Sequence, residues 1–148
     1  MSGGDLHRAH QLVQLKQREE QKASALWTEA RIALGQGQER LRQIEAWQRD
    51  YETKAGSLRK APHVGVLKDW RTFLEGLAVQ RQRAQAAVEG LEAACEERKG
   101  AFLRCLQQRK VAERYQASIK EADAKKRRQQ EARALDDLVG RPKPRTLS

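Results

Sequence analysis

Few side chains in this sequence have the types and the spacing that catalysis or metal binding requires. His7 and His10 are an i, i+3 pair that would share one helix face, but no cysteine or carboxylate cluster completes a metal site beside them. Cys95 and Cys105 would lie roughly 15 Å apart along a helix, too far for a disulfide. The chain has no glycine-rich phosphate loop and no serine in a nucleophile turn. We therefore expect a non-enzymatic protein with no cofactor and no metal.

The strongest chemical signal is positive charge in the last third of the chain. Residues 1–97 carry 15 Lys and Arg against 14 Asp and Glu, whereas residues 98–148 carry 15 against 6. The run Lys125-Lys-Arg-Arg128 could be a solvated helix face, a nucleic-acid contact or a contact with an acidic protein. No aromatic residue lies between Lys125 and Arg133, and acidic residues interrupt the stretch. This pattern favours docking on an acidic protein surface over binding along a phosphate backbone.

The elements that must position this charge are indicated by a seven-residue repeat of apolar residues. On the first half of the chain, twelve of sixteen repeat positions are apolar, spaced alternately by three and four residues, which is typical of a coiled-coil seam. One row is Leu6, Val13, Glu20, Trp27, Leu34, Leu41, Gln48 and Ala55, and the other is Ala9, Lys16, Ala23, Ala30, Gly37, Ile44, Tyr51 and Leu58.

The repeat stops once, between Gly56 and Gly65 around Pro62, and then resumes. One resumed row is Trp70, Leu77, Ala84, Leu91, Cys105, Ala112 and Ile119, and the other is Leu74, Val88, Cys95 and Phe102. A single break between amphipathic helices predicts an all-α protein, a long antiparallel two-helix coiled-coil hairpin with a longer second helix. A swapped dimer would share the same pattern.

We expect residues 1–148 to form a single hairpin. Its first helix would run over about residues 5–58 with Asp5 as N-cap, followed by a connector over 56–66. The second helix would begin between Val66 and Asp69 and run over about 67–139, before a basic flexible tail over 140–148. Folding about Ala61 pairs Leu6 with roughly residue 116 and Gly76 with Trp47, so some twenty residues of the second helix project beyond the first. We interpret most of the internal glycines as points of local flexibility.

The composition fits this architecture. Charged residues make up 34% and aromatic residues 5% of the chain, as in long helices and coiled coils. No apolar run is long enough to span a membrane, and no apolar segment that resembles a signal peptide stands at the start. The two cysteines are therefore interpreted as small seam residues of a reduced cytosolic protein.

The aromatic side chains are interpreted by their place relative to the seam. Trp27 and Tyr51 lie on it, and Trp47 lies at its edge, one position before a seam site. Trp70 and Phe73, followed by Leu74 and Leu77, widen the apolar face at the start of the second helix. We expect part of this cluster to close the end of the hairpin and part to be presented to a partner.

Four local motifs, in order, resemble those of the FliJ family of flagellar type III export proteins and its YscO-type injectisome counterparts. They are Ile44-Glu-Ala-Trp-Gln-Arg-Asp-Tyr51, Leu67-Lys-Asp-Trp70-Arg-Thr-Phe73-Leu-Glu-Gly-Leu77, Arg109-Lys-Val-Ala-Glu-Arg114 and Glu131-Ala-Arg-Ala-Leu135-Asp136-Asp137-Leu138. The resemblance covers roughly residues 6–139, and both the chain length and the hairpin plan agree with it.

The resemblance implies a cytoplasmic stalk, peripheral at the inner face of the cell membrane, that links a hexameric export ATPase to an export-gate membrane protein. Export chaperones are further implied partners. The predicted gate-binding patch consists of Trp70, Phe73, Leu77, Gln80 and Ala84. The predicted ATPase-docking end consists of Leu6, Val13, Arg109, Arg114, Lys125, Lys126, Arg127, Arg128 and Arg133. The alternatives are a basic nucleic-acid-binding coiled coil and a generic scaffolding rod. The flagellum and the injectisome both remain open as the host system.

Overall fold

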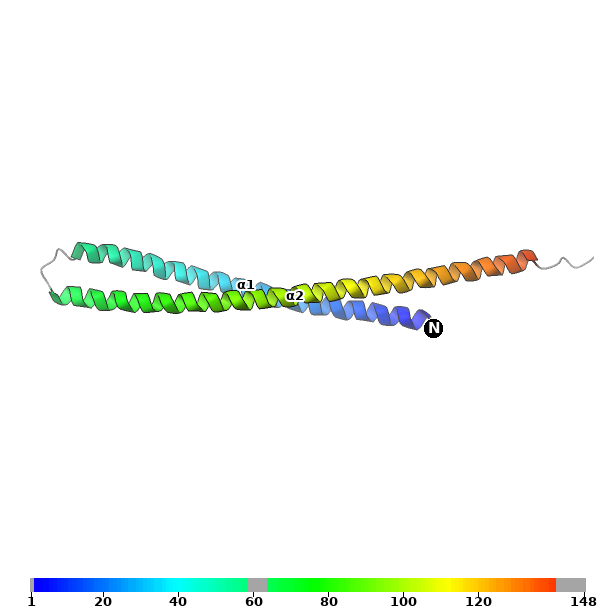
Figure 1. Ribbon diagram of the computed structural model, residues 1–148, viewed down its shortest axis with the longest axis horizontal. Coiled ribbons are helices and arrows are strands. Elements are labelled where there is room, and N and C mark those ends of the chain that lie inside the picture. The colour runs from blue at the N-terminus through cyan, green and yellow to red at the C-terminus, as the bar shows by residue number, and fades with distance from the viewer. Residues whose placement is uncertain (1, 59–63, 141–148) are drawn as a thin grey trace, which may run out of the picture. The chain divides into compact units, whose positions relative to one another are not determined.

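The computed structural model describes residues 2–58 and 64–140, and all of them lie in two α-helices (Figure 1). Helix α1 spans Ser2–Leu58 and helix α2 spans Val64–Gly140, with 57 and 77 residues respectively. Both are rich in Ala, Leu, Glu, Gln, Lys and Arg, which lose little conformational freedom in a helix. No strand occurs in the described ranges. The expected all-α hairpin with a longer second helix is confirmed.

The helix ends differ slightly from the expected ones. Because α1 begins at Ser2, Asp5 lies within its first turn and is not the N-cap. Its carboxylate still interacts favourably with the unpaired N–H groups of that turn. Helix α2 begins at Val64, before the expected range of 66–69, and ends at Gly140. The connector residues 59–63, with Pro62, and the basic tail 141–148 lie outside the described residues.

The contacts between α1 and α2 cluster into two units. Unit 1 consists of Met1–Glu20 and Arg104–Ser148, and unit 2 consists of Gln21–Leu103. In unit 1, Lys16 bonds to Gln108, and His10 to Gln116. In unit 2, Trp27 stacks on Phe102, and Tyr51 packs on Phe73. Residue numbers fall along α2 as they rise along α1, so the helices pair in antiparallel fashion within each unit.

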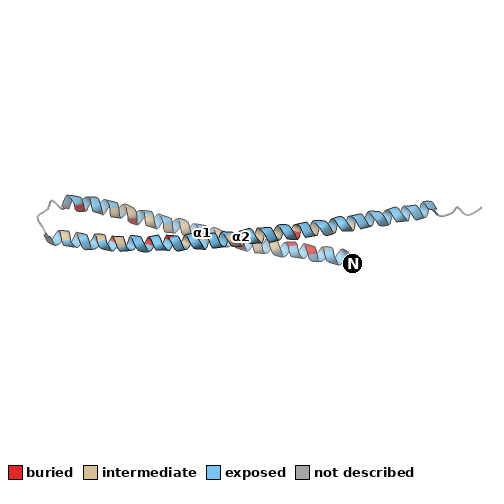
Figure 2. Ribbon diagram, viewed as in Figure 1, coloured by how far each residue is buried: buried red, intermediate tan, exposed pale blue. Residues whose placement is uncertain are grey.

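The seven-residue repeat correctly predicts which side chains turn inward (Figure 2). Every described position of both rows on α1 is buried or half-buried, including the polar residues Lys16, Glu20 and Gln48. The named apolar positions on α2 behave in the same way. The most deeply buried apolar side chains are Ala9, Val13, Ala23, Ile44, Ala55, Leu77, Ala84, Val88 and Ala112. Burial of a large apolar side chain is worth about 1.5–3 kcal/mol, so this seam holds the helices together.

In unit 1 the register of the pairing differs from the expected one by about one helical turn. A fold about Ala61 places residue 116 opposite Leu6, but Gln116 Nε2 lies 3.3 Å from Nδ1 of His10, four residues further along. Gly76 does not make room for Trp47 either, since no side chain lies within 4 Å of a Cβ built at Gly76. The register depends on which side chains pack across the seam, so it could not be predicted from the midpoint of the connector.

One glycine does make room across the seam. A Cβ built at Gly37 would lie 2.7 Å from Cδ1 of Leu91 and 3.7 Å from Cγ2 of Val88. Gly37 occupies a position of the seam repeat, so its missing side chain admits Leu91 from the facing helix. Gly35, Gly76 and Gly90, by contrast, face open space.

Candidate binding surfaces

An aromatic cluster occupies the part of unit 2 near the end of α1 and the start of α2. The Tyr51 ring packs edge-on against Phe73 with centroids 4.7 Å apart, and it lies 5.4 Å from Trp70. The rings of Trp70 and Phe73 also meet edge to face at 5.9 Å. Such aromatic pairs contribute about 0.5–1.5 kcal/mol beyond the area that they bury. The cluster therefore fixes this part of the hairpin, while Phe73 stays 45% exposed.

The residues predicted to form a gate-binding patch divide into two groups. Leu77 is 6% and Ala84 is 9% exposed, so both belong to the contact between α1 and α2. Trp70 is half-buried against Tyr51. Phe73 and Gln80 are exposed and accessible to a partner. Their spacing of seven residues places them on the same side of α2, at the edge of the seam.

Among the exposed apolar residues of unit 2 that were not part of the predicted patch are Trp47 and Val79. Trp47 is 50% and Val79 is 46% exposed. The position of Trp47 just before a seam site already placed it at the edge of the contact. Val79 lies outside both rows of the repeat, so the sequence alone could have indicated an apolar side chain on the exposed surface of α2. Both add apolar surface to unit 2.

The residues predicted to form the ATPase-docking end also divide. Val13 is buried, Leu6 is half-buried, and Arg109 is engaged in ion pairs within unit 1. The remaining members are exposed, namely Arg114, Lys125, Lys126, Arg127, Arg128 and Arg133. Arg127 pairs with Asp123 at 3.1 Å, one turn earlier on α2. The Arg127 side chain is 73% exposed despite this pair, so its charge remains accessible to a partner.

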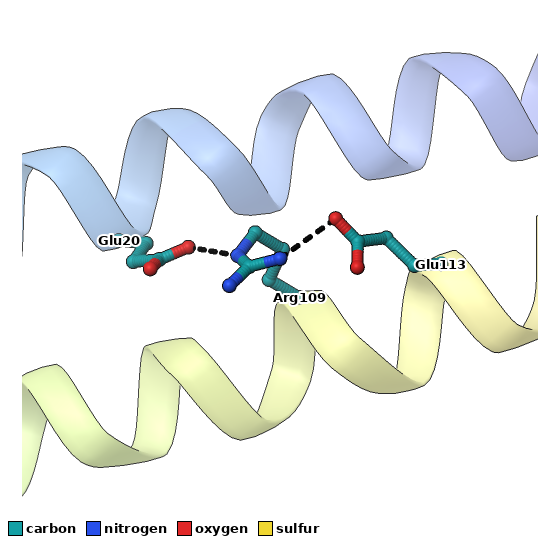
Figure 3. A network of polar contacts seen from close by, with 3 residues as sticks. All are labelled: Glu20, Arg109 and Glu113. Carbon is teal, nitrogen blue, oxygen red and sulfur yellow. Dashed lines mark hydrogen bonds and ion pairs between the residues drawn. The ribbon is translucent and has the colours of Figure 1, made fainter.

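Arg109 occupies a seam position of α2 and lies between two carboxylates (Figure 3). Its Nε donates to Glu20 of α1, and its Nη1 donates to Oε1 of Glu113, one turn further along α2, at 2.7 Å. The hydrogen bonds to Glu113 and Glu20 raise the pKa of Arg109 above its ordinary value. The raised pKa favours the charged form of the guanidinium. This network links the helices in unit 1 in place of an apolar pair.

The last part of α2 has no partner helix. Every residue from Ala124 to Gly140 is exposed (Figure 2). Besides the basic residues, this stretch carries Leu135, Leu138 and Val139, which are 61%, 68% and 86% exposed. Their i, i+3, i+4 spacing places all three on one face of the helix. Large apolar side chains so fully exposed are typical of a binding surface.

The described residues also include His7, His10 and the two cysteines that could have formed a metal or redox site. His7 and His10 are exposed, and His10 bonds to Gln116. Residues 2–58 and 64–140 hold no group of three or more side chains that could bind a metal ion. Cys95 and Cys105 are unpaired and half-buried at seam positions. Over their described lengths, neither α1 nor α2 offers a stretch long and apolar enough to cross a membrane.

These features define a helical hairpin that presents exposed side chains along its helices. A sequence model of a protein family, described as "Flagellar FliJ protein", matches residues 7–142. The chain belongs to the FliJ family, and it is accordingly a component of the flagellar protein export apparatus. Comparison with curated protein sequences and with solved structures gave no match.

Proposed function

We propose that the protein is a non-enzymatic stalk that links the hexameric export ATPase to the cytoplasmic domain of the export-gate membrane protein and so promotes export. It acts in the cytoplasm, peripherally at the inner face of the cell membrane, and export chaperones are further partners. The observation that carries this proposal is the unpaired end of α2, residues 124–140, which is exposed throughout and basic.

The exposed end of α2 suits docking on an acidic protein surface. Lys125, Lys126, Arg128 and Arg133 supply charge that no ion pair within the described residues engages. Leu135, Leu138 and Val139 supply apolar anchors on one face. Helices of this kind bind in grooves through anchors spaced by three and four residues. In this proposal the export ATPase receives the end of α2, while Leu6, Val13 and Arg109 support it from within the hairpin.

The exposed aromatic residues of unit 2 suit a second partner. Phe73 and Trp47 are each about half exposed, and aromatic side chains dominate the energetics of many protein interfaces. We assign the gate-binding surface to Phe73, Gln80 and the half-buried Trp70. Leu77 and Ala84 hold α2 against α1 and act only through the packing that they provide.

The test of ATPase docking is a pull-down with the purified export ATPase. Reversal of four charges in Lys125→Glu, Lys126→Glu, Arg127→Glu and Arg128→Glu should abolish capture, because the partner surface is expected to be acidic. The matched control reverses Arg40, Arg83, Arg98 and Lys99, four exposed cations of unit 2, and should leave capture intact. Circular dichroism on both variants checks that helicity is unchanged. If the export ATPase captured the first variant as well as the parent protein, the proposal that it binds the end of α2 would be wrong.

A duplex-DNA shift at physiological salt separates this function from nucleic-acid binding. Phosphate contacts by lysine and arginine weaken steeply as salt rises. We expect no sub-micromolar binding under these conditions. Tight binding that is lost in the four-charge variant would instead favour the nucleic-acid alternative. Capture of neither the ATPase nor DNA would leave a scaffolding rod as the better description.

A further inference from the structure

Four large apolar side chains are exposed together in unit 1, away from the end of α2. Leu12 and Leu15 of α1 are 37% and 49% exposed, and Val111 and Tyr115 of α2 are 59% and 53% exposed. Spacings of three and four residues place each pair on one face of its helix. We call these four residues the Tyr115 patch. None of them lies on the seam, so the pairing of α1 with α2 does not require them to be apolar.

The contacts of Lys16 show that both halves of the patch lie on the same flank of unit 1. The Nζ atom of Lys16 lies 3.3 Å from Oε2 of Glu19 on α1 and 3.4 Å from Oε1 of Gln108 on α2. Leu12 precedes Glu19 by seven residues and Tyr115 follows Gln108 by seven, so each shares the side of its helix with a residue that meets Lys16. The Tyr115 patch is therefore one surface formed by two helices.

The opposite flank of unit 1 is polar. There His10 bonds to Gln116, and Glu113 accepts a hydrogen bond from Arg109. These side chains carry charge or hydrogen-bonding groups where the Tyr115 patch carries leucine, valine and tyrosine. A coiled coil that meets only water needs no such difference between its two flanks. The asymmetry indicates that one flank packs against a further element.

Four exposed arginines frame the patch. On α1, Arg8 lies seven residues before Leu15 and Arg18 lies three after it. On α2, Arg104 lies seven residues before Val111 and Arg114 lies three after it. None of the four forms an ion pair with a residue of the described ranges. The carboxylates near these arginines include Glu19, which is bonded to Lys16, Asp5, one turn before Arg8, and Glu97, two turns before Arg104.

We propose that the Tyr115 patch binds an acidic amphipathic α-helix of a partner protein, which packs across α1 and α2 as a third helix. The four apolar side chains would take the apolar anchors of that helix. Its flanking Asp and Glu side chains would pair with Arg8, Arg18, Arg104 and Arg114. Arginine favours this role because its planar guanidinium binds a carboxylate through two hydrogen bonds.

Charge decides which partner fits. A second copy of this chain carries the same net charge of +10 and the same four arginines, so two patches would repel each other. Nucleic acid would satisfy the arginines but would leave the apolar centre without a partner. An anionic membrane would satisfy both, but it is contacted by the broad apolar face of one helix lying flat. The patch instead draws two residues from each of two helices.

The probe is a synthetic helical peptide of about three heptads, with leucine at the a and d positions and glutamate at e and g. We expect the full-length protein to bind it in fluorescence anisotropy. Replacing Leu15, Val111 and Tyr115 by serine should weaken binding at least tenfold, equivalent to about 1.4 kcal/mol. The matched control is Ile32→Ser with Val79→Ser, two residues of similar exposure in unit 2, and it should bind within twofold of the parent.

A second pair of variants tests the charges. Arg8→Glu with Arg104→Glu should weaken binding at least tenfold, whereas Lys125→Glu with Lys126→Glu should change it less than twofold. All variants should keep the parent melting temperature to within a few degrees, because every substituted residue is exposed. The Arg8 and Arg104 variant leaves residues 125–133, the charges assigned to ATPase docking, unchanged. Peptide binding at the Tyr115 patch is therefore tested independently of the proposed ATPase docking.

Three outcomes would overturn the inference. In the first, the serine variant binds the peptide as tightly as the parent. In the second, a peptide with lysine in place of glutamate binds equally well, so that charge has no role. In the third, vesicles containing phosphatidylserine bind the parent and not the serine variant while the peptide does not bind, so that the patch contacts a membrane.

Discussion

The two units of the hairpin use different side chains for the same task. In unit 2 the seam contains Trp27 stacked on Phe102, the Tyr51 cluster and the buried side chains of Ile44 and Leu77, with Gln48 and the Glu45–Arg81 ion pair as its polar members. In unit 1 the buried apolar residues are Ala9, Val13 and Ala112, and the seam includes Lys16, Glu20 and Arg109. Large apolar side chains give affinity between helices, whereas charged seam residues specify register at a cost in stability.

This difference shows that one continuous seven-residue repeat can produce regions in which the two helices pair with unequal stability. Unit 2 gains most from apolar burial, so it should determine the overall stability. Unit 1 gains less from burial and depends on the geometry of hydrogen bonds and ion pairs for its pairing. Buried or half-buried ion pairs are weak contributors to net stability but are costly to break singly. We therefore expect the helices to separate first in unit 1.

The largest effect should follow from Leu77→Ala, which removes a buried side chain from the seam of unit 2. We expect it to lower the free energy of unfolding by about 2–5 kcal/mol, because it leaves a cavity. Phe73→Ala, four residues earlier and half exposed, should cost much less stability while it weakens binding to the gate protein at least tenfold. Melting temperature and gate affinity are measured on the same samples. A gate affinity unchanged by Phe73→Ala would contradict the assignment of that surface.

Hydrogen exchange should expose the difference in strength between the units directly. Backbone amides of residues 5–20 should exchange at least tenfold faster than those of residues 25–55, corresponding to about 1.4 kcal/mol of opening free energy. Both segments belong to the same helix, so each serves as the control for the other in a mass-spectrometric experiment. Equal protection along α1 would show that charge and apolar burial hold the helices equally well.

The contact at Gly37 offers a smaller test. Gly35→Ala should stabilise the protein by about 1 kcal/mol, because alanine favours the helix and the site is open. Gly37→Ala gains the same propensity, but its new methyl group would displace Leu91 from its position across the seam. It should therefore stabilise the protein less than Gly35→Ala or destabilise it. Thermal unfolding of the two variants checks this, and an equal gain would mean that Leu91 shifts freely.

The smallest expected effect concerns the ion-pair network of unit 1. A double-mutant cycle with Glu20→Gln and Arg109→Gln should give a favourable coupling that falls as salt is added. The pKa of Arg109 is raised in the folded protein. The ion pairs of its guanidinium therefore stabilise the folded state fully at pH values below the pKa of Arg109 in the unfolded chain. This stabilisation is lost only as the pH rises through the higher pKa of the folded state. The arginine should therefore add no pH dependence between pH 5 and 9. A coupling of zero at low salt would mean that the network plays no part in the pairing.

Most of the fold could be predicted because the seven-residue repeat reports directly on burial. All described positions of the two rows on α1 turn inward, even where Lys16, Glu20 and Gln48 interrupt the apolar pattern. Trp27 and Tyr51 pack in the seam as predicted, and Phe73 is 45% exposed. The register was wrong by about one turn in unit 1, because a midpoint drawn through the connector ignores which side chains fit across the seam.

The candidate sites were less predictable. Leu77 and Ala84 were assigned both to a seam row and to the gate-binding patch, and their burial against α1 agrees with the seam row. Arg109 could be recognised as basic, but its pairing with Glu20 required the facing helix to be placed. The Tyr115 patch is formed by residues nearly a hundred positions apart in sequence, so only the antiparallel pairing brings its halves to one flank.

The sequence by itself determined the all-α class, the two helices and the inward-facing rows, because these depend on local propensity and on a period that any helix imposes. The family also follows from sequence. Only the tertiary structure decided the register, the space that Gly37 leaves for Leu91 and the ion pairs of Arg109. These features depend on which side chains of α2 face α1, and that match is a property of the two helices together.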